Sequence, residues 1–85
     1  MKISIESTSK VVMLELPGGG AMPARIWQGE TADGIPVQCF ITRIVPEIPK
    51  SDPNIDRLTA EFERDLQRQA DPRPSVTAIP LRMII

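Results

Sequence analysis

One segment of the chain has helical periodicity, and it stands among several segments with the alternating pattern of strands. Its apolar residues recur at Ile55, Leu58, Phe62 and Leu66, which form one stripe of an amphipathic helix of about 17 residues. Asp52, followed by a proline, predicts the helix start, because Asp caps free N–H groups and proline is tolerated in the first turn. A single helix of this size covers one face of a small sheet and cannot cover two.

Five segments have the composition or the alternation of β-strands. They span residues 3–6, 11–16, 22–30, 35–45 and 76–85. Ser7-Thr8-Ser9 predicts a turn between the first two, and Asp33-Gly34 predicts a tight hairpin between the third and the fourth. We therefore predict one small α+β domain over residues 1–85. It has a mostly antiparallel sheet of about five strands, in the order β-β-β-β-α-β, with the amphipathic helix packed on one face.

The register of the second hairpin is open at this stage. If the Asp33-Gly34 loop has two residues, Trp27 lies opposite Phe40. If Gly34 is the bulge residue after a type I turn, Trp27 lies opposite Cys39 instead, because a one-residue slip exchanges the faces of one strand. In both registers each face of the hairpin carries apolar side chains.

The second face of the sheet is therefore covered by solvent, by a ligand or by a partner. Burial of apolar surface stabilises by roughly 25 cal/mol per Å², so a second copy on that face would help a small chain greatly. A strand buried on both sides within one monomer gives the same pattern and is the alternative. We predict self-association through residues of the sheet and of the apolar C-terminus, namely Phe40, Leu81, Met83, Ile84 and Ile85.

The chain lacks the residues that catalysis and metal binding use most. It has no histidine, no tyrosine and a single cysteine, Cys39. Histidine is the commonest general base and metal ligand, and a structural zinc site needs four Cys or His ligands. We expect a protein that is not an enzyme and that holds no metal and no cofactor.

Charge and hydropathy restrict the partners further. The net charge is −1 and the basic residues are scattered, which argues against general nucleic-acid binding. Apolar runs are far shorter than the about 18 residues of a membrane-spanning helix, and the N-terminal stretch does not resemble a signal peptide. We expect a cytoplasmic protein without a membrane partner.

Three residues of the second hairpin predict a ligand site. Arg25, Trp27 and Arg43 could together hold a small anionic, aromatic ligand such as a nucleotide, because arginine pairs with phosphate and an indole stacks on a base. The alternative is that the indole belongs to the core and that both arginines are solvated. The glycine triplet at 18–20 leads into a strand, not a helix, which indicates a loop rather than a phosphate cradle.

Parts of the sequence resemble small proteins encoded in phages and mobile elements. The segments that carry the resemblance are 25–30, 41–44 and 78–84. The resemblance implies a protein that acts by binding, and it transfers no catalytic residue. The leading hypothesis is a self-associating, phage-type counter-defence protein that inhibits a host protein or sequesters a nucleotide signal. The alternative is a virion or assembly accessory with a structural role.

Overall fold

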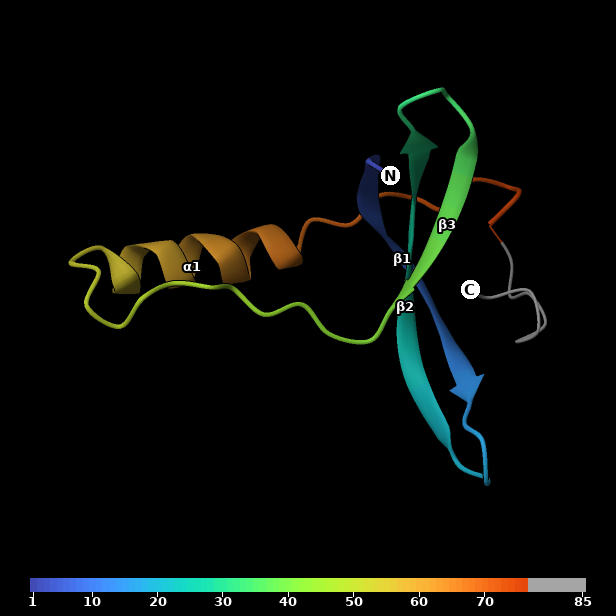
Figure 1. Ribbon diagram of the computed structural model, residues 1–85, viewed down its shortest axis with the longest axis horizontal. Coiled ribbons are helices and arrows are strands. Elements are labelled where there is room, and N and C mark those ends of the chain that lie inside the picture. The colour runs from blue at the N-terminus through green and yellow to red at the C-terminus, as the bar shows by residue number, and fades with distance from the viewer. Residues whose placement is uncertain (77–85) are drawn as a thin grey trace.

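The computed structural model describes residues 1–76 and contains, within them, an antiparallel sheet and one α-helix (Figure 1). The sheet order is β1-β2-β3, and the elements are β1 (Ile3–Glu15), β2 (Ala21–Thr31), β3 (Pro36–Ile41) and α1 (Ile55–Leu66). The predicted α+β class is confirmed. The predicted count of five strands is not, and the last of those five, apart from Val76, lies outside the described residues.

The first two predicted strands form one continuous strand, β1, so the turn predicted at Ser7-Thr8-Ser9 is wrong. The pairing of β1 with β2 shifts register between Ser7 and Val11, which marks a β-bulge. Within the bulge the Thr8 hydroxyl donates a hydrogen bond to the Ile26 carbonyl oxygen at 2.6 Å. The small polar residues that suggested a turn therefore form a bulge. There the Thr8 hydroxyl takes the place of a backbone N–H as the hydrogen-bond donor to β2.

The β2–β3 hairpin takes the second of the two predicted registers. Trp27 pairs with Cys39, and Ile26 pairs with Phe40. Gly34 has a φ of 84°, a left-handed conformation that favours glycine, and its N–H donates to the Thr31 carbonyl oxygen at 2.9 Å. Ile26 and Phe40 consequently share one face of the sheet, and Trp27 lies on the other.

The helix does not pack on a face of the sheet, which corrects the predicted architecture. It extends sideways from the sheet in Figure 1, and none of its residues is buried. It begins at Ile55, with Asn54 at the cap position and no side-chain cap, so the predicted capping of the helix by Asp52 is wrong. The Asp52 carboxylate instead accepts the N–H of Asn54 in a turn ahead of the helix. It also ends at Leu66, so it has 12 residues, fewer than the predicted length.

The early end of the helix has a cause in β1. The outer edge of β1 engages the chain directly after α1: Ser7 Oγ donates to the Arg68 carbonyl oxygen at 2.9 Å, and Thr8 forms a parallel bridge with Ala70. Backbone groups that pair with a strand cannot continue a helical ladder. The sheet edge therefore competes with the helix for residues 68–70.

A strap of residues 70–76 covers the Ile26 face in place of the helix. Three side chains of the sheet donate hydrogen bonds to carbonyl oxygens of the strap: Gln28 to Asp71 (3.2 Å), Gln38 to Ser75 (2.9 Å) and Lys10 to Val76 (3.3 Å). The strap is thus fixed to the sheet mainly by polar contacts.

The core of the described residues is small. Its buried residues are three apolar ones, Ala24, Ile26 and Val76, and three polar ones, Ser7, Thr8 and Gln28. The radius of gyration is 15.3 Å, whereas a compact chain of this length has a radius of about 12 Å. The molecule is therefore open, with a projecting helix and a long two-stranded ribbon.

Candidate functional site

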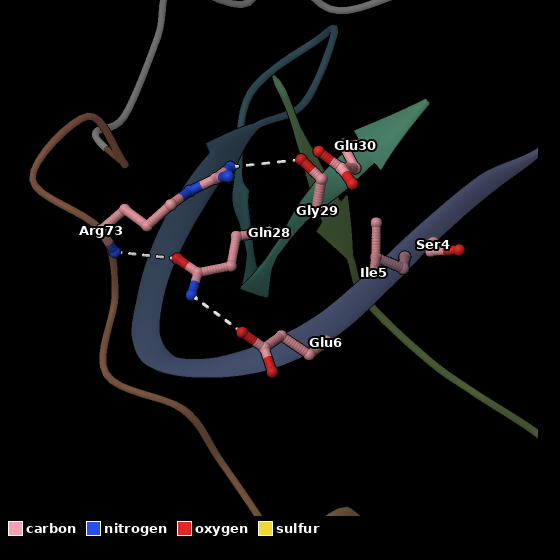
Figure 2. A pocket seen from close by; sticks show the side chains of 7 residues that line it. All are labelled: Ser4, Ile5, Glu6, Gln28, Gly29, Glu30 and Arg73. Atoms are coloured by element: carbon pink, nitrogen blue, oxygen red, sulfur yellow. Dashed lines mark hydrogen bonds between the residues drawn. The ribbon is translucent and has the colours of Figure 1, made fainter. Parts of the chain in front are cut away.

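One hollow lies between the sheet and the strap (Figure 2). Its volume is about 360 Å³, and five of its seven lining residues have polar side chains: Ser4, Glu6, Gln28, Glu30 and Arg73, with Ile5 and Gly29 completing it. The Gln28 side chain reaches across it, because its Nε2 donates to Glu6 Oε1 at 3.2 Å and its Oε1 accepts the N–H of Arg73 at 2.8 Å. Arg73 Nη2 adds a contact to the Gly29 carbonyl oxygen at 3.4 Å.

These contacts give this hollow a structural role. Gln28 is 5% exposed, and a buried amide is costly unless both of its ends are hydrogen-bonded. Here the carbonyl oxygen and the amino group of Gln28 are both used, on partners from β1 and from the strap. Gln28 and Arg73 therefore act as a clasp that holds the strap on the sheet. No local sequence pattern indicates this clasp, since a glutamine in an alternating strand looks like any solvated residue.

The second hollow, called the Trp27 hollow below, lies on the opposite face of the sheet. Its volume is about 150 Å³. Its polar and aromatic lining comes from β1, from β2 and from the loop after β3, and the end of the helix closes one side: Ser7, Arg25, Trp27, Thr42, Arg43 and Leu66. Ile41 and Ile44 complete it. The structure therefore brings the three predicted ligand residues, Arg25, Trp27 and Arg43, around one hollow.

The two arginines differ in how they are held. Arg25 is half-buried and its Nη1 donates to the Thr8 carbonyl oxygen at 2.9 Å, which fixes the guanidinium at the bulge of β1. Arg43 is exposed and follows the end of β3. Neither pairs with a carboxylate of the described residues, where the ion pairs lie on or beside α1. The lining of the hollow includes no acidic residue, so its electrostatic character is positive.

The hollow depends on the anchoring of the helix end. Ser7, which pairs with Trp27 across the sheet, donates its hydroxyl hydrogen bond to Arg68 just beyond α1. This contact holds the end of α1 near the hollow that Leu66 and Trp27 both line. Bulge, sheet and helix end thus meet at one point, and a sequence reading could list the arginines and the tryptophan but could not place the helix beside them.

The predicted interface residues are only partly visible. Phe40 pairs with Ile26 on the face that the strap covers, and it is half-buried. Leu81, Met83, Ile84 and Ile85 lie outside the described residues. Cys39 is free and half-buried.

Residues 1–76 show no sign of a metal site or of a membrane-spanning helix. No three acidic or cysteine side chains gather there in a way that could hold a metal ion. The helix in this range is too short and too polar to cross a membrane. A comparison of the chain with family models, curated proteins and solved structures finds no match.

Proposed function

We propose that this chain is a non-enzymatic binding protein that works as a homo-oligomer. The supporting observation is its open shape. The accessible surface is 6746 Å², whereas a compact monomer of this mass exposes about 5,000 Å². The excess is larger than the about 800 Å² that each partner buries in a standard stable interface. The small apolar core points the same way, because short chains with little core often gain stability by association.

The contact between copies is proposed to be the far half of the β1–β2 hairpin, called the ribbon below. It comprises residues 11–16 and 20–24, which extend beyond the last residue of β3 that pairs with β2, as Figure 1 shows. A two-stranded hairpin alone is marginally stable in water. Four of its large apolar side chains are exposed, Val11 (49%), Met13 (61%), Leu16 (40%) and Met22 (41%), and Val12 and Leu14 are half-buried. The ribbon therefore has both an apolar surface and an unpaired strand edge that a second copy can contact.

The charge of the ribbon favours a second copy over a different partner. Among residues 11–24 the only charged residue is Glu15. In a two-fold symmetric contact the same patch meets itself, so any charge near the axis meets a like charge. A nearly neutral apolar ribbon avoids that repulsion, and a second copy is the occupant that needs no complementary charge.

A pair of matched variants tests this proposal. Met13→Glu introduces a charge on the ribbon, and Ile35→Glu introduces the same charge at the β2–β3 turn, where the side chain is almost equally exposed (59% against 61%). Light scattering after size-exclusion chromatography should show that Met13→Glu lowers the mass of the particle toward one chain and that Ile35→Glu leaves it unchanged. Equal masses for both variants and the unmodified protein would refute the ribbon as the contact.

The biological partner of the oligomer stays a prediction from the sequence. The phage-type role, with a host protein or a nucleotide signal as the target, draws on the resemblance carried by residues 25–30, 41–44 and 78–84. A binding role of this kind needs an exposed recognition surface, and the Trp27 hollow is a surface with suitable chemistry.

A further inference from the structure

The Trp27 hollow combines a positive rim with an aromatic wall. Arg25 and Arg43 supply guanidinium groups that no carboxylate of the described residues neutralises, and Trp27 supplies the ring. Guanidinium groups bind phosphate through charge-assisted hydrogen bonds, and an indole stacks on a flat ring. We propose that the hollow binds a ligand with a phosphate joined to a flat aromatic base, as in a mononucleotide. This proposal rests on the binding role proposed above but not on self-association.

The arginines are proposed to bind the phosphate of the ligand, and the aromatic and apolar side chains its base. Arg25 is pinned by its contact with Thr8, so it presents its remaining N–H groups from a fixed position. Arg43 is exposed in the segment that follows β3 and supplies the second guanidinium group. Thr42, its neighbour in the chain, adds a hydroxyl to the lining. Leu66 and Ile44 line the same hollow as the indole and give apolar surface for the base.

The size of the hollow restricts the ligand. A volume of about 150 Å³ is half or less of the roughly 300–1,000 Å³ of pockets that enclose a whole drug-sized molecule. The hollow therefore accommodates the end of a small ligand, with the rest of it in solvent. A mononucleotide fits this limit, whereas a long nucleic acid would need a continuous basic surface, and the chain has a net charge of −1.

The single tryptophan of the chain provides a direct test. Trp27 fluorescence is recorded during titration with adenosine monophosphate, with inorganic phosphate and adenosine as separate arms. Excitation lies where adenine does not absorb. We expect saturable quenching by the nucleotide, at lower concentration than by either half. Saturation by phosphate alone at the same concentration, or no saturation by any probe, would overturn the proposal.

Two arginine variants complete the test. Arg43→Gln should weaken nucleotide binding by about tenfold or more, the effect of losing a charge-assisted hydrogen bond. Arg64→Gln removes the same charge from the exposed side of α1 and should leave binding unchanged. Equal affinities for the two variants would refute the site. Light scattering on the same samples reports self-association, so a failed ligand site and a failed oligomer give different results.

Discussion

Gly29 lies in a crowded part of the sheet, unlike the other glycines of the chain. A Cβ atom built there would collide with the Ser4 carbonyl oxygen and would lie 2.7 Å from Ile5 Cα. Both contacts are with the backbone of β1, which cannot move aside without giving up its pairing with β2. The position therefore needs glycine for space, since the turn and loop glycines have open space around them.

Gly29→Ala should destabilise the fold by about 3 kcal/mol or more, in the range of severe steric substitutions. Gly34→Asn is the matched control, because asparagine tolerates the left-handed conformation and a Cβ at Gly34 meets nothing within 4 Å. Urea unfolding followed by circular dichroism measures both. An alanine at position 29 that leaves the unfolding midpoint in place would show that the two strands are not so closely packed.

Thr8 connects the bulge of β1 to its neighbour. Its hydroxyl donates to the Ile26 carbonyl oxygen and accepts the N–H of Lys10 at 3.2 Å. Thr8→Val keeps the shape and removes both bonds, so it should lower the free energy of unfolding by about 2 kcal/mol. Ser9→Ala, at an exposed neighbour, should change it by less than about 0.5 kcal/mol. Chemical denaturation distinguishes the two, and equal stabilities would contradict this role of the hydroxyl.

Local residue patterns predicted where turns lie, but they did not predict which distant side chains bind each other. The Asp33-Gly34 signal located the β2–β3 turn, and the alternative with Gly34 as the bulge residue gave the observed pairing of Trp27 with Cys39. The Gln28–Arg73 clasp could not be predicted, because it joins residues 45 positions apart through side chains with no local pattern. Long-range polar contacts leave no periodicity in a sequence.

At the scale of elements, α1 is the least supported part of the fold. It has 12 residues, no side-chain cap at its N-terminus and no buried residue. Isolated helices of this length are marginal in water. Periodicity predicted that the helix exists and which residues form its stripe, but not where the stripe would lie. The position of the helix depends on the connections, and one face of the sheet is covered by the strap instead.

This difference predicts unequal hydrogen exchange. Backbone amides of α1 should exchange on the order of 100-fold faster than those of the buried part of β2 around Ile26, because local opening needs far less energy where few contacts are lost. Exchange measured by mass spectrometry on peptides from 55–66 and 24–30 checks this. Protection of the helix equal to that of β2 would mean that a partner surface covers α1, and would contradict its description as an exposed arm.

At the scale of the whole molecule, the chain has more surface than its core can support. Its dimensions of 44 × 36 × 25 Å describe an open body, and the buried apolar side chains of residues 1–76 are Ala24, Ile26 and Val76. The sequence anticipated this excess, since one helix was too little for a sheet with two apolar faces. The sequence alone could not identify the ribbon as the exposed part. The length of β1 and the early end of β3 depend on how each strand pairs with β2.

The most direct test of this account is sedimentation equilibrium of the unmodified chain across micromolar concentrations. Self-association through the ribbon predicts a mass of at least twice the 9.4 kDa of one chain, with dissociation only on dilution, as mass action requires. A mass of one chain at every concentration would contradict the central claim, because the exposed apolar ribbon would then have no second copy to cover it.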